Sequence, residues 1–234
     1  MGQNIGAAGA RPATILCMLI LAAVPAAAGA QDRGEWYVSG AGTISMLEST
    51  EGTIANAPFP GSSIRTQNEF GTGWGAQAAL GYDFGRFRTE LEVGFNKDTQ
   101  DDYVAIAPPT GRLPADVEED SIRAMLNAYV DIMDGPIQPY LGAGIGMTRI
   151  DLVFIGPRAP FPTEAPRELI NDHDNRFAYQ LMAGVAFALN DRVALTGQYR
   201  WLDAGTFRGL DSRGEPITRD HAGHHIDFGV RLSF

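Results

Sequence analysis

The chain has 234 residues and carries 28 acidic against 18 basic side chains, a formal net charge of −10. An acidic chain argues against nucleic acid as a partner and against docking on an anionic surface through a basic patch. No apolar run after the first 30 residues approaches 18 residues, which excludes membrane helices but leaves open a membrane barrel, whose alternating strands average to mild hydropathy. The single cysteine, Cys17, lies near the N-terminus, so residues 31–234 hold neither a disulfide nor a cysteine-based metal site.

Residues 1–30 have the three parts of a secretory signal peptide. One basic residue, Arg11, is followed by the apolar run ATILCMLILAAV (13–24) and then by small residues ending at Ala30. The run is too short for a transmembrane helix, and this order of parts is typical of a cleaved export signal. We therefore predict cleavage after Ala30 and one domain over residues 31–234.

Eight later segments alternate apolar with polar or small residues at period two, as β-strands do. In FRTELEVGF (87–95), for example, Leu91 and Val93 share one face while Glu90 and Glu92 share the other. Each segment has roughly 9–13 residues, enough to cross a bilayer when tilted. The segments are 36–47, 73–85, 87–95, 121–133, 139–147, 177–189, 193–201 and 224–234.

The connections between these segments alternate strictly in length. Long ones cover about 48–69, 97–118, 151–175 and 203–221, and short ones cover 85–86, 134–137 and 190–191. Outer-membrane barrels place short turns in the periplasm and long loops outside. We therefore predict an all-β fold: an eight-stranded, antiparallel, up-and-down transmembrane β-barrel with short periplasmic turns and long extracellular loops.

Aromatic residues are expected to form two belts, one at each membrane–water interface. The predicted periplasmic belt contains Trp36, Tyr82, Phe84, Phe87, Tyr140 and Phe234. The predicted outer belt contains Phe70, Trp74, Phe95, Phe177, Tyr179, Tyr199 and Trp201.

The export signal, the eight segments, the stretch QPYLGAGIG (138–146) and the ending FGVRLSF (228–234) resemble the small outer-membrane β-barrel family. That family includes the OmpA membrane domain and the opacity-type surface proteins. In it, alternating apolar residues before a terminal Phe form the signal that the barrel-assembly machinery reads. The resemblance implies this role for Ile226, Phe228, Val230, Leu232 and Phe234.

The resemblance also implies a location in the cell outer membrane, with its lipid and lipopolysaccharide as partners. It further implies a structural or surface-interaction role, in adhesion or envelope integrity, without chemistry of its own. Proline-rich loop tips such as GPRAPFPTEAP (156–166) are candidates for contact with a host or phage surface. The acidic stretch around 97–120 could bind divalent cations, although the pattern favours a solvated loop.

Charged residues on the opposite strand faces are expected to point into the lumen. An eight-stranded barrel has an interior that side chains can fill, and a charge removed from water is tolerable only when it is paired. We therefore predict a charge network that plugs the lumen around Glu90 and Glu92. Its members are Arg88, Glu90, Glu92, Arg123, Arg200, Asp227 and Arg231, and Asp131 is a further charged residue on the inward face.

Two apparent ligand motifs have simpler explanations. GAGIG (142–146) lacks the third glycine of a dinucleotide fingerprint, since Met147 stands there, and its glycines suit a crowded barrel interior. His221, His225 and Asp227 share a face but complete no characteristic metal-ligand set, which favours polar residues at the wet rim. We predict neither cofactor nor metal.

Two other function classes stay open at this point. A small porin-like channel would use the same fold with an open lumen. A barrel lipid hydrolase would need Ser and His side by side on the lipid face, and no His is followed two positions later by Ser. The sequence therefore favours a protein that is not an enzyme.

Overall fold

The structure, a computed structural model, describes residues 34–47, 50–55, 63–68, 72–105, 111–156, 167–212 and 214–234. The predicted signal peptide, Phe70 and the proline-rich loop tips lie outside these ranges. Within them no helix is long and apolar enough to cross a membrane. The strands are β1 (Glu35–Leu47), β2 (Thr50–Ala55), β3 (Ser63–Asn68), β4 (Thr72–Asp83), β5 (Phe87–Ala105), β6 (Gly111–Asp131), β7 (Ile137–Gly156), β8 (Arg167–Ala188), β9 (Val193–Leu210) and β10 (Pro216–Ser233).

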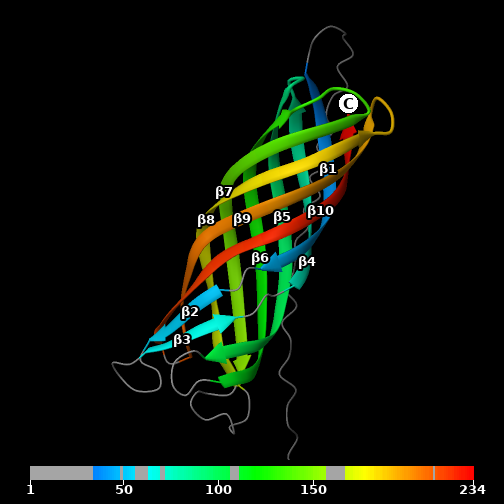
Figure 1. The fold of residues 1–234 in the computed structure, drawn as a ribbon. Helices are drawn as coiled ribbons and strands as arrows, with labels where there is room; N and C mark the ends of the chain where they lie inside the picture. Colours follow the sequence, from blue (N-terminus) through cyan, green and yellow to red (C-terminus); the bar gives the residue numbers. More distant parts are fainter. Residues whose placement is uncertain are drawn as a thin grey trace, which may run out of the picture. The chain divides into compact units, whose positions relative to one another are not determined.

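Eight strands form a closed antiparallel ring in the order β1, β4, β5, β6, β7, β8, β9 and β10, and β10 pairs back onto β1. The closing ladder runs from Tyr37 opposite Ser233 to Leu47 opposite Gly223. Figure 1 shows β10 beside β1, with the strands wound obliquely around one axis. Lipid offers no hydrogen-bond partner, so a closed sheet without edges is the form that can cross a bilayer. The predicted eight-stranded barrel is confirmed.

The three connections predicted to be short are tight turns. Gly85 (φ 101°) and Gly135 (φ 127°) take the left-handed conformation that glycine adopts without strain. In the β8–β9 turn the Asn190 side chain accepts hydrogen bonds from the backbone N–H groups of Arg192 (2.9 Å) and Val193 (3.0 Å). The C-terminus lies at the end of the barrel that carries these three short turns, in keeping with an even strand number (Figure 1).

The connections predicted to be long are largely strand. β6 and β7 pair from Asp131 out to Asp116, well beyond the apolar alternation that ends at Ile122. In the first connection, β2 and β3 form a hairpin that pairs with β10 through Ile54 and with β5 through Thr66. This hairpin continues the wall where β1 has ended and β4 has not begun. Sequence alternation missed these extensions because backbone pairing continues where the outer face no longer needs to be apolar.

The wall has an apolar outer face and a polar inner face over its turn-side half. In β5, Leu91 and Val93 are 60% and 56% exposed, whereas Glu90 and Glu92 are buried. The apolar residues of the predicted assembly signal, Ile226 to Phe234, also face outward. This pattern fixes the register, because a slip of one residue would exchange the two faces.

The outward apolar band ends at Phe95, Ile122 and Ile226, and the next outward residues are polar, for example Lys97 and Asp120. We take the strands between the short turns and this limit as the membrane-spanning segments. Beyond the limit the outer face is polar, and in β7 and β9 the inner face becomes apolar. A buried apolar cluster lines this part of the lumen and reaches back to Met125, opposite Glu92. Its members are Met125, Ile150, Leu152, Phe154, Ile170, Ala178, Leu202, Ala204, Phe207 and Ile217.

Aromatic pairs mark both limits of the apolar band. Near the turns, the ring centroids of Trp36 and Tyr82 are 5.1 Å apart, and at the outer limit those of Tyr179 and Trp201 are 5.6 Å apart. Tyr140 was assigned to the periplasmic belt, and that assignment is wrong. Tyr140 lies on the same face of β7 as the inward-facing glycines, so its ring is buried in the lumen.

Deleting Phe234 tests the predicted assembly signal. Phe234 ends the alternation of β10, and its backbone N–H donates to the Trp36 carbonyl oxygen (2.9 Å) at the seam. We expect the deletion to lower the amount of folded protein in outer membranes while export continues, as measured by fractionation at low expression. Phe84→Ala, which removes an equally exposed aromatic ring at the β4–β5 turn, is the matched control. Unchanged folded yield after the deletion would contradict the assignment.

Candidate functional site: the charged barrel interior

Buried polar side chains fill the lumen in three layers. The turn-side layer is centred on Arg88, the central layer on Glu92, and the outer layer on Glu119. In the part of the chain that the structure describes, no three His, Cys, Asp or Glu residues are placed to hold a metal ion.

The central layer is built around the Glu92 carboxylate. Its Oε1 accepts from Arg123 Nε (2.8 Å) and Arg200 Nη1 (3.1 Å), and its Oε2 accepts from Asn127 Nδ2 (2.8 Å). Glu92 is 1% exposed and Arg200 is 0% exposed. A buried carboxylate with two guanidinium partners and an amide donor meets the condition under which buried charge is tolerated.

Arg200 links this carboxylate to a second one on β10. Its Nη2 donates to Asp227 Oδ1 (3.0 Å), which also accepts from the Thr43 hydroxyl (2.7 Å). The Gln77 carbonyl oxygen accepts from both Arg123 (2.5 Å) and Arg200 (2.6 Å) and so lies between the two cations. The layer therefore connects β1, β4, β5, β6, β9 and β10 across the lumen.

Glycines make room for these large inward side chains. A Cβ at Gly94 would overlap the Arg123 guanidinium, and a Cβ at Gly144 would overlap the Asn127 side chain. Gly142 lies against the Tyr129 ring in the same way. The GAGIG stretch is thus the expected run of small inward residues on a β-strand.

The turn-side layer surrounds Arg88 with aromatic rings. Arg88 Nε and Nη2 donate to the two oxygens of Asp131, each at 2.9 Å. The guanidinium carbon lies 5.0 Å from the Tyr129 ring centroid and 4.9 Å from that of Tyr140, within the range of cation–π attraction. Arg231 belongs to this layer, because its Nη2 donates to Gln138 Oε1 (2.9 Å).

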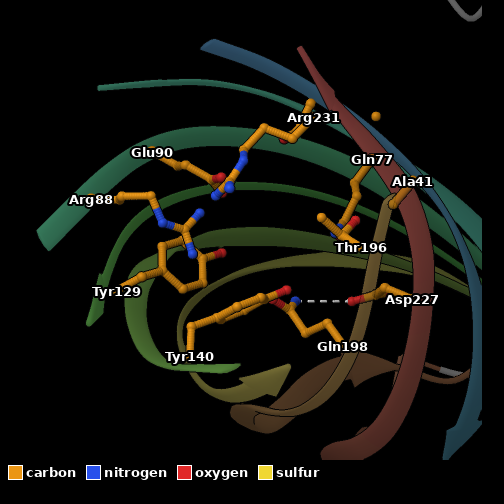
Figure 2. A pocket seen from close by; sticks show the side chains of 12 residues that line it. Ala41, Gln77, Arg88, Glu90, Tyr129, Tyr140, Thr196, Gln198, Asp227 and Arg231 are labelled. Atoms are coloured by element: carbon orange, nitrogen blue, oxygen red, sulfur yellow. Dashed lines mark hydrogen bonds between the residues drawn. The ribbon is translucent and has the colours of Figure 1, made fainter. Parts of the chain in front are cut away.

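A small cavity separates the turn-side and central layers. It measures about 40 Å³ and is lined by Arg88, Glu90, Tyr140, Asp227 and Arg231, among others (Figure 2). That volume has room for a few water molecules, and its polar walls offer them partners. Glu90 faces this space and, among the described residues, forms none of the ion pairs.

The structure thus divides the predicted network into two groups. It brings Glu92, Arg123, Arg200 and Asp227 together and places Arg88, Asp131 and Arg231 in the turn-side layer. Glu92 has two cationic partners, whereas Glu90 lies beside the cavity. Which cation meets which carboxylate depends on how strands across the lumen are staggered, and alternation does not show this.

Sequence reasoning missed the outer layer. Glu119 on β6 contacts His221 Nδ1 (2.6 Å) and Arg219 Nη1 (3.2 Å) on β10, and Asp98 on β5 accepts from the Ser45 hydroxyl. His221 was expected at the wet rim, but it is buried inside, and so is His225. Even-numbered residues of β5 face inward, as Glu90 and Glu92 do. Extending this alternation to Asp98 could have placed the outer layer inside the barrel.

A family model for the outer membrane protein beta-barrel domain matches residues 14–234. The chain belongs to this family. It is therefore a protein of the outer membrane, as its apolar outer wall requires. An uncharacterised protein of Brucella abortus is 36% identical over 102 residues, which cover 42% of this outer-membrane barrel chain but only about a third (36%) of that relative. Outer membrane protein PagN of Salmonella typhimurium is 26% identical over 151 residues, 60% of each chain.

Two solved structures show the same fold at low sequence identity. OprG of Pseudomonas aeruginosa has a TM-score of 0.53 at 16% identity, over 86% of this chain and 97% of that one. The outer membrane protease OmpT of Escherichia coli has a TM-score of 0.50 at 8% identity, over 89% and 99%. These likenesses concern the barrel alone.

Glu92→Gln tests the central layer of this outer-membrane barrel. The change leaves Arg123 buried without an anionic partner, so we expect the free energy of unfolding in urea, measured in detergent micelles, to fall by roughly 3–5 kcal/mol. Glu118→Gln, on the exposed face of β6, is the matched control and should change it by less than about 0.5 kcal/mol.

Arg231→Gln tests the separation of the two layers. Because Arg231 contacts Gln138 and not Glu92, its effect should add to that of Glu92→Gln within about 0.5 kcal/mol. A harmless Glu92→Gln, or strong coupling between the two substitutions, would contradict the assigned layers.

Proposed function

We propose that this protein is a closed outer-membrane barrel that acts through its structure and its exposed surface, without conducting solutes or catalysing a reaction. The observation that carries the proposal is the filled lumen. The side chains of Glu92 and Arg200 are almost completely buried, and so are those of the apolar cluster beyond them.

Two different barriers lie in series along the axis. A solute would first have to separate the ion pairs that Glu92 and Asp227 make with Arg200, which leaves buried charge uncompensated. It would then meet the cluster around Ile150 and Phe207, where an apolar constriction excludes water. The cavity near Glu90 lies between two of the layers and has room for only a few waters.

The groups that could carry chemistry are also inaccessible. The His221–Glu119 contact and the Ser45–Asp98 hydrogen bond are both inside the lumen, and each of these side chains is buried. A nucleophile and base have to meet a substrate. This supports a role without chemistry of its own, and the shared barrel fold of OmpT does not transfer its protease activity.

The outer wall offers the interaction surface. Beyond the apolar band, Lys97, Asp120, Arg149 and Asp151 face outward at the level where lipid headgroups meet water. They suit contact with lipopolysaccharide, while the strand extensions and the β2–β3 hairpin carry the chain further from the membrane. The role that we assign to the strand extensions and the β2–β3 hairpin is adhesion to a host or phage surface.

Planar-bilayer recording tests the closed lumen. Refolded protein, with insertion verified by protease protection of the barrel, should show no steady conductance above the bare bilayer, because both barriers are intact. A porin reconstituted in parallel serves as the positive control. Large, steady conductance of the wild-type protein would replace this proposal with the porin-like channel.

A further inference from the structure

Two buried carboxylates face each other in the outer layer. Asp98 on β5 and Glu119 on β6 are direct cross-strand partners, both point inward, and both are 3% exposed. Like charges at directly opposed positions destabilise a sheet. The pair therefore needs compensation from elsewhere in the barrel.

The two basic side chains of this layer contact Glu119 and not Asp98. His221 Nδ1 lies 2.6 Å from Glu119 Oε1, and Arg219 Nη1 lies 3.2 Å from Glu119 Oε2. Among the described residues, Asp98 receives only the Ser45 hydroxyl. β6 and β10 are not neighbours in the ring, so the Glu119 contacts brace the barrel across its lumen.

The two carboxylates differ in how their charge is compensated. Glu119 contacts the Arg219 guanidinium, which is always positive, and the His221 ring. Asp98 forms no ion pair among the described residues, so its charge is buried beside that of Glu119 with only a hydroxyl donor. One proton added to Asp98 removes that charge.

We propose that the outer layer is a proton-binding switch: Asp98 takes up one proton in mildly acidic medium and thereby tightens the brace between β6 and β10. Protonation removes the repulsion between Asp98 and Glu119 and leaves Glu119 to its two partners. The layer lies beyond Phe95 and Ile122, where the outward apolar band ends, on the side away from the short turns, so it responds to the external medium.

The environments of the two carboxyls separate their titrations. Burial raises the pKa of Asp98 to about 6, and the Glu119 charge adds to the rise, against the Ser45 hydroxyl, His221 and Arg219. Burial also acts to raise the pKa of Glu119, but the neighbouring His221 and Arg219 hold it at about 2. Glu119 thus stays ionised over the range in which Asp98 changes charge.

The sign of the effect follows from linkage. The folded-state pKa of Asp98 lies above its ordinary value of 3.8, so the folded state binds the proton more strongly than the unfolded chain. Stability therefore increases as pH falls through 6 and levels off below 4. Between pH 8 and pH 5 the folding equilibrium constant should increase roughly tenfold from this group.

The test is urea unfolding of the refolded full chain in micelles at several pH values between 8 and 5. Asp98→Asn keeps the shape of the side chain and the acceptor for Ser45, so it should raise stability at pH 8 and remove the tenfold dependence. Asp120→Asn, on the exposed outer face of β6 beside Glu119, is the matched control and should keep the wild-type profile. His221→Gln should also keep the pH dependence, because Asp98 remains.

Infrared difference spectra of the wild-type protein between pH 8 and pH 5 provide a measurement that does not depend on folding of a variant. A protonated, buried carboxyl band should appear with a midpoint near pH 6. The same pH dependence in Asp98→Asn as in wild type, its loss in His221→Gln, or the absence of that band would overturn the proposal.

Discussion

The need to pair every backbone N–H and C=O group inside lipid is the constraint from which the rest of this structure follows. It forces β10 onto β1, and the closed ring of eight strands encloses a space that side chains can fill. The outer face must then be apolar, so the polar half of each alternating strand has to point inward. Charge inside so narrow a space has to be paired, and this gives Glu92 its two guanidinium partners.

The reversal of polarity along single strands extends the same reasoning. In β7 the membrane-spanning part has apolar residues such as Ile145 outside and glycines inside, whereas beyond it Arg149 is outside and Ile150 inside. A wall that leaves lipid for water exchanges the solvent on its outer face. The barrel therefore has a charged interior within the membrane and, beyond it, an interior where an apolar cluster lies alongside the buried layer around Glu119. The charged network and the apolar cluster together close the lumen.

Much of the barrel could be predicted from the sequence, because the alternation of apolar and polar residues indicates whether each side chain faces lipid or the lumen. It placed Glu92 inside and Phe228 outside, and the strict sequence of long and short connections predicted the even, closed ring. It could not show that Arg200 and not Arg231 meets Glu92, because partners across the lumen depend on stagger. It also placed Asp98 in a loop, since the apolar signal stops where the bilayer stops while hydrogen-bonded pairing continues.

The most direct test of the account is a double-mutant cycle between Glu92 and Arg200, with Glu92→Gln, Arg200→Met and the double variant unfolded in urea under one set of conditions. If the buried pair holds β5 to β9 across the lumen, the double variant should lose less stability than the sum of the single variants, by at least about 1 kcal/mol. Additivity within about 0.5 kcal/mol would mean that the two side chains do not interact, and the paired-charge interior would be wrong.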